Sequence, residues 1–212
     1  MGITRYEDLD GMALDVMREI GSIGTGNAAT ALSGMMNEQV QMTVPEIDIK
    51  GFNEAIELLG EPEDVVAAVM VRMSGDVEGM MLFLLRLEFV NEILESILGK
   101  RIEDYSELDD MEISALTEVG NIMISSYTNA LSGLAAMDIS LSVPAIAVNM
   151  LGGILSVPMA EMGYETDKLM LINGKLIIRD KKHDSTILML PDIESLNKLM
   201  EKLVGGYVDE RN

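Results

Sequence analysis

Apolar residues recur at helical spacing in two long stretches of the chain. The first stretch begins at Thr4 and Glu7, which are spaced like a capping box, and the second begins at Ser106 and Asp109. Each predicted helix should end in a glycine-containing stretch, near residues 34 and 133 respectively. The apolar positions that predict the two helices are Leu9, Met12, Ala13, Val16, Ile20 and Ile23, and then Ile113, Leu116, Val119 and Met123.

Alternating apolar and polar residues follow each predicted helix, at 40–44 and at 139–143, and indicate half-buried strands. Pro45 and Pro144 come directly after them. Because proline has no amide to donate to a sheet, each proline should mark an edge, a bulge or a strand end. Further strands are predicted at 65–73 and 80–87, joined by a turn, and at roughly 153–158, 168–179 and 185–190. An amphipathic helix closes each half, around 94–98 and 200–204.

The chain repeats itself at an offset of 99 residues. Nine identities fall in the 31-residue window 15–45 when it is laid on 114–144 without a gap. The closing helices match at an offset of 106 instead, so seven extra residues should lengthen a loop of the second half, around 160–168. The identities pair Glu19 with Glu118, Gly21 with Gly120, Ile23 with Ile122, 31–34 with 130–133, and 44–45 with 143–144.

These elements predict a mixed α+β fold made of an internally duplicated α-β-β-β-α repeat. Hairpins within each repeat favour a largely antiparallel sheet with helices packed on it, and the duplication favours a pseudo-twofold axis. We expect one domain over residues 1–212, made of two repeats at about 4–100 and 106–206.

The composition narrows the class of protein. With 212 residues, 48% of them hydrophobic and 24% charged, the chain can bury a substantial core. It has no cysteine, which excludes disulfides, thiol catalysis and thiolate metal sites. It has no run of eighteen apolar residues and no signal-peptide pattern, so we expect no membrane insertion and a cytoplasmic location.

The charge is strongly acidic, with 36 Asp and Glu against 15 Lys and Arg and a net charge of −21. This argues against nucleic acid or anionic lipid as partners, because binding to either depends on Lys and Arg. An acidic surface could steer a partner with a basic face or serve solubility alone. The 19 methionines suit both core packing and adaptable partner surfaces.

A polar pair lies on each long predicted helix. Glu118 and Asn121 are three residues apart and therefore share one face of the second helix. The matching residues of the first helix are Glu19 and Ser22. Solvated helix faces carry such pairs routinely, so the spacing alone does not identify a site.

Three glycines, Gly21, Gly24 and Gly26, lie in the interior of the first predicted helix. Each costs about 0.8–1 kcal/mol relative to alanine. They indicate close approach of other groups, which could be the packing of the helix on the sheet or a docked partner. A phosphate-binding loop is excluded, because no Gly-Lys-Ser/Thr follows and no strand precedes the glycines.

Other candidate sites are weaker. His183 is the only histidine, which excludes a two-histidine metal site, and it lies in the polar segment 181–184, where we expect it to be solvated. The segment 75–79 carries two carboxylates that could bind a cation, although hairpin turns use the same residues for backbone reasons. We predict no metal site on this chain.

The two copies together resemble the CheC/CheX/FliY family of chemotaxis phosphatases, whose motif is Asp or Ser, then Glu, Asn and a distant Pro. The second copy matches this pattern at every position and spacing, and residues 19–31 and 75–79 are similar to CheC-like members in particular. Two Glu-bearing helices, and an end at residue 212 that leaves no room for a switch domain, also favour CheC. The residues that carry the resemblance are Asp15, Glu19 and Pro45 in the first copy and Ser114, Glu118, Asn121 and Pro144 in the second.

The resemblance implies a reaction. The substrate would be the aspartyl phosphate of a CheY-type response regulator, which would itself supply Mg²⁺ and most of the phosphate ligands. Asn121 would position the attacking water, and Glu118 would pair with the regulator's lysine. An amide can donate to water and accept from it, and positioning with electrostatics carries most phosphoryl-transfer catalysis. No cofactor bound by this chain is implied.

The first copy departs from the family motif, because Ser22 stands where Asn is expected. We predict a site that is weak or inactive in catalysis, although Glu19 could still dock a regulator. Asn27 faces about 140° away from Ser22 and is no substitute. The alternative is a non-catalytic adaptor that binds the receptor deamidase CheD or the flagellar switch. Because the duplication already supplies a pseudo-dimer, we expect a monomer.

Overall fold

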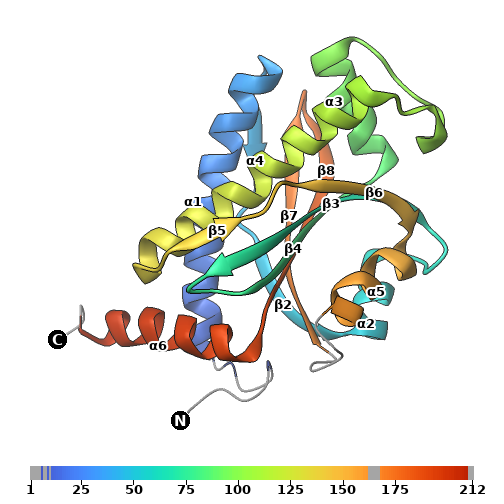
Figure 1. Cartoon of the computed structure of the whole chain (residues 1–212). Coiled ribbons are helices and arrows are strands. Elements are labelled where there is room, and N and C mark those ends of the chain that lie inside the picture. Colours follow the sequence, from blue (N-terminus) through green and yellow to red (C-terminus); the bar gives the residue numbers. More distant parts are fainter. Residues whose placement is uncertain (1–5, 7–8, 10, 162–167, 210–212) are drawn as a thin grey trace.

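The computed structural model describes residues 6, 9, 11–161 and 168–209, with side chains as far as residue 203. Within these residues the chain forms six α-helices and eight strands of one sheet (Figure 1). The first half contains α1 (Gly11–Met36), β1 (Val40–Met42), β2 (Glu46–Gly51), α2 (Phe52–Leu59), β3 (Val65–Gly75), β4 (Gly79–Leu85) and α3 (Leu87–Leu98). The second half contains α4 (Asp110–Ala135), β5 (Ile139–Leu141), β6 (Ala145–Met150), α5 (Leu151–Glu161), β7 (Lys168–Ile178), β8 (Lys181–Pro191) and α6 (Ile193–Asp209).

The sheet mixes strands from both halves. Its order is β1-β7-β8-β4-β3-β5. Strand β2 pairs with β7 along the same edge as β1, and β6 pairs with β3 along the same edge as β5. Strands β4 and β8, one from each half, pair at the centre, and the first two strands of each half pair with the third strand of the other half. Every pairing between described strands is antiparallel. The predicted fold class is therefore confirmed, and the exchange of strands is its main feature.

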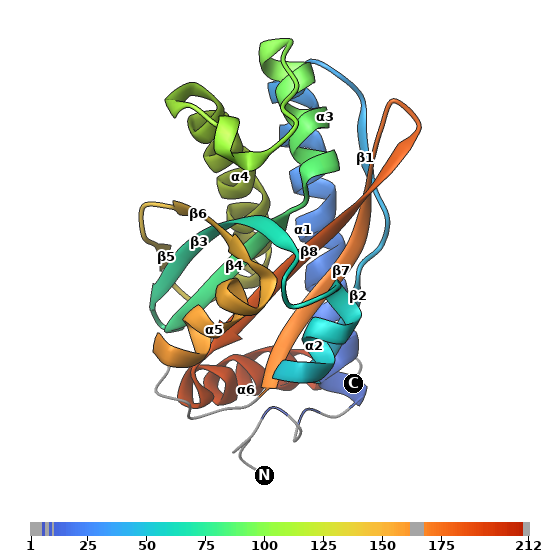
Figure 2. The same ribbon diagram turned by 90° about the vertical axis from the view of Figure 1, so that its right-hand side faces the viewer.

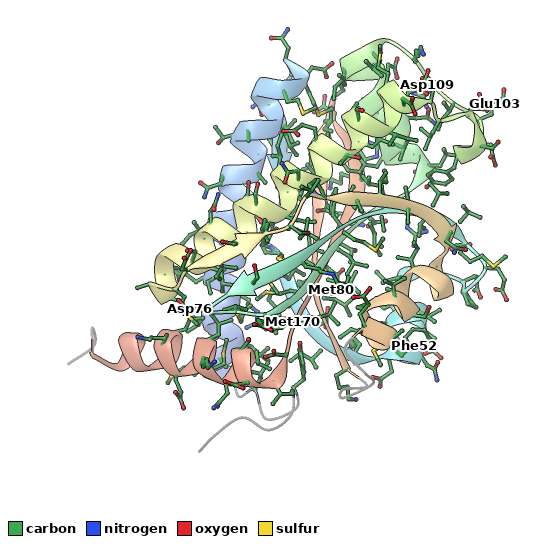
Figure 3. All side chains as sticks on the ribbon, in the orientation of Figure 1. Phe52, Asp76, Met80, Glu103, Asp109 and Met170 are labelled. Atoms are coloured by element: carbon green, nitrogen blue, oxygen red, sulfur yellow. The ribbon has the colours of Figure 1, made fainter. Side chains whose placement is uncertain are left out.

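Both faces of the curled sheet are covered by helices, as Figures 1 and 2 show. One apolar cluster joins the sheet to α1, α3, α4 and α6, and includes Met170. A second, smaller cluster joins the other face to α2 and α5, and includes Met80 and the partly buried Phe52 (Figure 3). Burial on both faces explains why β4 is a continuous apolar run and not an alternating one.

The two long helices cross on the larger cluster. At the crossing, a Cβ added to Gly24 would lie only 3.0 Å from the Cα of Tyr127, so the glycine allows the two backbones to approach. The hydroxyl groups of Thr25 and Tyr127 share a buried hydrogen bond of 2.7 Å beside this contact. Burial raises the pKa of Tyr127 and keeps its hydroxyl protonated.

The order of elements differs from the predicted one, because each half contains a helix and a strand that were not expected, and the two missed strands are β2 and β6. Residues 153–158, predicted as a strand, lie within α5, and α2 was missed. The apolar run of α5 shows no clear period, so its pattern does not distinguish a helix from a strand. In α2, helical spacing of Phe52, Ala55, Ile56 and Leu59 was a readable signal.

The starts and ends of the long helices largely follow the prediction. Asp109 caps α4, and the helices end at Met36 and Ala135, close to the predicted glycines. Ser106 belongs instead to a short 3-10 helix at Tyr105–Glu107. The predicted capping box at residues 4 and 7 lies outside the described residues.

The seven extra residues of the second half are distributed along it. Met73 of β3 pairs with Leu141 of β5, and Leu176 of β7 pairs with Met42 of β1. The offset has therefore grown from 99 to 103 when the chain reaches β7. One further residue enters at the β7–β8 hairpin, and two lie between β8 and α6. A single loop around 160–168, which lies partly outside the described residues, accounts for at most four of the seven.

Candidate functional site

The start of α4, the helix that carries Glu118 and Asn121, is firmly capped. The carboxylate of Asp109 accepts hydrogen bonds from the backbone nitrogens of Met111 (2.9 Å) and Glu112 (3.2 Å), and the carboxylate of Glu112 accepts one from Asp109 N (2.7 Å). The pKa of Asp109 lies below its ordinary value, and the hydrogen bond from the backbone nitrogen of Glu112 is the largest cause. This capping box fixes the first turn of the helix.

The packing of α4 leaves the polar pair on an open surface. Gly120 presses against β3, where a Cβ on the glycine would lie 2.4 Å from the Cβ of Val69. Glu118, on the far side of the helix, is exposed, and Asn121 is half-buried. Ser114, one turn earlier, is also exposed, and its hydroxyl donates to a backbone carbonyl of its own helix. An open face of this kind suits a macromolecular partner better than a small molecule, which needs a concave pocket.

The first copy presents the corresponding residues on α1. Glu19 and Ser22 are both exposed. Asp15 forms an exposed ion pair of 2.6 Å with Arg18, one turn before Glu19. The structure therefore brings each predicted polar pair onto one helix face, on α1 and on α4 separately.

The two motif prolines end strands, as expected. Pro45 is buried between β1 and β2, and Pro144 is half-buried between β5 and β6. The residue two positions before each proline holds this break in place: the hydroxyl of Thr43 accepts a hydrogen bond from Lys175 N of β7 (2.9 Å), and that of Ser142 accepts one from the backbone of β3 (3.0 Å). These hydroxyls were not predicted, although they occupy equivalent positions in the two copies.

The three glycines of α1 have different neighbours. A Cβ on Gly21 would lie 2.8 Å from Pro45 Cγ, so this glycine lets α1 pack on the strand end. Gly24 meets α4, as described above, whereas Gly26 is exposed and a Cβ there would have nothing within 4 Å. Packing therefore explains two of the three glycines, one against the sheet and one against a helix.

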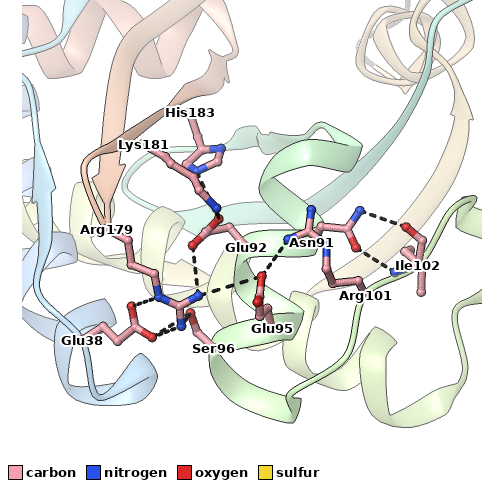
Figure 4. A network of polar contacts seen from close by, with 10 residues as sticks. All are labelled: Glu38, Asn91, Glu92, Glu95, Ser96, Arg101, Ile102, Arg179, Lys181 and His183. Carbon is pink, nitrogen blue, oxygen red and sulfur yellow. Dashed lines mark hydrogen bonds and ion pairs between the residues drawn. The ribbon is translucent and has the colours of Figure 1, made fainter.

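His183 is not solvated, and the prediction that it would be is wrong. Its side chain is 7% exposed, its ring stacks on Phe89 with centroids 5.4 Å apart, and its Nε2 lies 3.9 Å from the buried carboxylate of Glu92. Lys181 and Arg179 approach the same carboxylate at 2.9 and 3.4 Å (Figure 4). Burial is the main cause that lowers the pKa of His183.

The reason for this error is the position of the turn. The hairpin turns at Arg179 and Asp180, which both have positive φ, so the polar segment 181–184 is already strand β8 and alternates its side chains between the two faces. Arg179 also binds Glu38 just after α1 and approaches Glu95 of α3. The network in Figure 4 thus fastens the tip of the β7–β8 hairpin to two helices.

The acidic turn at 75–79 has a structural role. The carboxylate of Asp76 accepts a hydrogen bond from Asp138 N (2.8 Å), and Glu78 N donates to the hydroxyl of Ser195 (2.8 Å). The turn therefore joins the β3–β4 hairpin to the end of α4 and the start of α6. Among the described residues there is no group of three or more His, Asp or Glu side chains arranged to hold a metal ion.

A search of the described helices finds none that is both long and apolar enough to span a membrane.

Comparison with known proteins places the chain in a family. The sequence model of the CheC-like family matches it twice, at residues 12–49 and 111–148, which are again 99 positions apart. The CheY-P phosphatase CheC of Bacillus subtilis (strain 168) is 31% identical over 197 residues, which cover 90% of this chain and 93% of that protein. The flagellar motor switch phosphatase FliY of the same organism is 26% identical over 145 residues, 68% of this chain and 38% of its own length.

A solved structure agrees with the fold. The crystal structure of Thermotoga maritima FliY superposes with a TM-score of 0.74 at 23% identity and covers 93% of this chain and 98% of that one. With a match across nearly the whole length at 31% identity, and a family pattern that occurs once in each half, this chain belongs to the CheC-like family.

Proposed function

We propose that this protein is a chemotaxis phosphatase that hydrolyses the aspartyl phosphate of a CheY-type response regulator. The observation that carries the proposal is the pair of exposed Glu118 and half-buried Asn121 on one face of the capped helix α4. Membership of the CheC-like family supports it, since the similar Bacillus subtilis protein is named a CheY-P phosphatase. The open surface fits a protein substrate that brings its own phosphate.

Asn121 positions the water in this mechanism. Its amide carbonyl accepts a hydrogen bond from the water, and its NH₂ group donates one, so the lone pair of the water oxygen is held in line with the phosphorus. The new P–O bond forms as the bond between phosphorus and the aspartyl oxygen breaks. The products are the free carboxylate of the regulator and inorganic phosphate.

Glu118 docks the regulator. Its carboxylate is exposed one turn before Asn121, where it can form a charge-assisted hydrogen bond with a lysine of the partner. In this scheme the Mg²⁺ that neutralises the phosphate oxygens belongs to the regulator, and this chain contributes position and charge. Ser114 lies one turn before Glu118 on α4, and Pro144 lies between β5 and β6.

The first copy docks without releasing phosphate. It keeps Asp15, Glu19 and Pro45, but Ser22 has a single hydroxyl in place of the planar amide. A hydroxyl on a shorter side chain cannot both reach the water and hold it from two directions as an amide does. Glu19 would still offer its carboxylate to a regulator's lysine.

A phosphate-release assay tests the proposal. The wild-type protein should accelerate the loss of phosphate from a regulator phosphorylated by acetyl phosphate, and Asn121→Ala should lower kcat roughly 100-fold. Asn129→Ala is a matched control, because Asn129 is an exposed asparagine two turns further along the same helix. Full acceleration by Asn121→Ala would contradict the proposal.

A second candidate role is that of an adaptor. The shared fold with a flagellar motor switch phosphatase and the altered first copy both favour binding without catalysis at one face. The partner would be the flagellar switch or the receptor deamidase CheD. A stable complex with either protein, combined with no effect of wild type on phosphate release, would favour this role over the phosphatase.

A further inference from the structure

The exposed residues that α1 and α4 share lie along one line of the helix surface. Three identities are exposed in both copies, and with 100° of rotation per residue they fall within about 60° of one another. A fourth, the isoleucine at positions 23 and 122, lies within the same band and is exposed in α1 and half-buried in α4. The three pairs are Met12 and Met111, Glu19 and Glu118, and Gly34 and Gly133.

The two methionines on this line lie outside both apolar clusters of the core, so packing does not explain their retention. Met111 is 62% exposed and Met12 is 48% exposed, and Ile23 is 39% exposed. Most aligned positions of the two copies have diverged. An exposed methionine kept at the same place in both copies, on the face that carries the retained glutamate, therefore points to contact with a partner.

We propose that Met111 and Ile122 are apolar contacts that seat the phosphorylated response regulator on α4. They lie on either side of Glu118, about 10 Å before it and about 6 Å after it along the helix axis. The contacts rest on the proposed function and extend it from the reacting pair to the docking surface. The regulator must then present apolar surface on both sides of the lysine that meets Glu118.

Methionine suits this position because its unbranched side chain adapts to a partner's surface. The backbone of Met111 is held by its hydrogen bond to the Asp109 cap, so only the side chain has to order on binding. Since the contact is equally present before and during the reaction, it strengthens binding and leaves the chemical step unchanged.

The test measures KM and kcat for phosphate release, and separately the affinity for a regulator activated with beryllofluoride. Met111→Gln should raise both KM and the dissociation constant about five- to tenfold, with kcat within about twofold of wild type. Met12→Gln is the matched control from the first copy. Leu134→Gln is the control from α4 itself, because Leu134 is 46% exposed but faces about 140° away from Met111. Both controls should leave KM within about twofold.

A second variant covers the other side of the glutamate. Ile122→Thr should raise KM in the same way, with Ile23→Thr as its control, and thermal unfolding of both variants identifies any loss of fold. Because Ile122 is partly packed against the core, its substitution can also change stability, and Met111→Gln is therefore the decisive variant. An unchanged KM and dissociation constant for Met111→Gln would overturn the proposed contact, as would an equal rise in the KM for phosphate release for Met12→Gln or Leu134→Gln.

Failure of this inference differs from failure of the proposed function. If Asn121→Ala abolishes phosphate release while Met111→Gln binds the regulator as wild type does, the proposed reaction is supported and the proposed contact is contradicted. If Asn121→Ala releases phosphate normally, the proposed function itself falls.

Discussion

The helices α1 and α4 carry the same line of surface residues but rest on different parts of the sheet. Gly120 sets α4 directly on Val69 of the inner strand β3, whereas the equivalent Gly21 sets α1 on Pro45, at the end of an outer strand. The side chain at the proposed reacting position differs as well, with Asn121 on α4 and Ser22 on α1. Under the proposed function, both copies keep the docking glutamate and only α4 keeps the amide that positions water.

The fold explains why the two copies can diverge without loss of stability. The side chains that differ at the sites, Asn121 and Ser22, face solvent to different degrees, and neither belongs to the buried core. Exchange of strands between the halves keeps the sheet continuous. A substitution at either position therefore leaves the buried core unchanged.

The largest contrast should come from glycine substitutions in the two helices. Gly120→Ala places a Cβ against Val69, so it should lower the free energy of unfolding by about 1–3 kcal/mol even after the gain in helix propensity. Gly26→Ala meets open space and should raise it by up to about 1 kcal/mol. Urea unfolding measures both, and equal stability of the two variants would contradict the close contact with β3.

Charge removal should separate the two copies next. Glu118→Gln should raise KM for phosphate release about tenfold, because the ion pair with the regulator's lysine is replaced by a hydrogen bond to an uncharged amide. Glu19→Gln should leave KM and kcat within about twofold, because the proposed function assigns phosphate release to the second copy alone. Steady-state kinetics with a phosphorylated regulator measures both variants. A rise in KM for Glu19→Gln equal to that for Glu118→Gln would mean that both copies process substrate.

The crossing between the two helices gives a smaller effect. Thr25→Val leaves the buried hydroxyl of Tyr127 without its partner and should cost about 1–2 kcal/mol of unfolding free energy. Removing both hydroxyls in Thr25→Val with Tyr127→Phe should cost less than Thr25→Val alone, since no buried polar group is then unsatisfied. Denaturant melts of the singles and the double measure the coupling, and strictly additive losses would argue against the hydrogen bond.

The smallest effect concerns the tips of the β3–β4 and β7–β8 hairpins, because His183 near the β7–β8 tip has a glycine as its equivalent in the other hairpin. Burial lowers the pKa of His183 in the folded chain. As the pH falls, the unfolded chain therefore takes up a proton near the ordinary histidine pKa of about 6.5, and the folded chain takes it up only at lower pH. Stability from this group is therefore full above that ordinary pKa and declines as the pH falls below it.

Chemical unfolding at pH 7.5 and pH 5.5 tests this sign. Wild type should lose stability on acidification more steeply than His183→Gln, by no more than about 1.4 kcal/mol per pH unit. The β3–β4 tip carries a glycine, Gly79, at the position equivalent to His183 and should add no such dependence. A variant as pH-sensitive as wild type would show that His183 does not titrate on unfolding.

Much of the fold could be predicted because the signals were periodic or repeated. The offset of 99 residues gave both long helices, the strand breaks at Pro45 and Pro144, and the relation between Glu118 and Glu19. Two of the failures lacked such a signal, whereas the missed helix α2 carried one. The run at 153–158 is apolar throughout, so no period distinguished helix from strand, and the distribution of the extra residues depends on strand register.

The candidate site was also predictable only in part. A shared face for Glu118 and Asn121 follows from helical spacing alone. Which strand each helix rests on depends on contacts between the halves, such as Gly120 with Val69, and no local pattern encodes them. The burial of His183 was missed because its charged neighbours suggested a solvated turn, whereas strand alternation turned its ring inward.

The most direct test of the account compares Asn121→Ala with Ser22→Ala in one phosphate-release assay with saturating phosphorylated regulator. Asn121→Ala should reduce kcat roughly 100-fold, and Ser22→Ala should leave it within about twofold of wild type. Equal losses in the two variants, or an unchanged kcat for Asn121→Ala, would contradict the claim that α4 alone releases the phosphate.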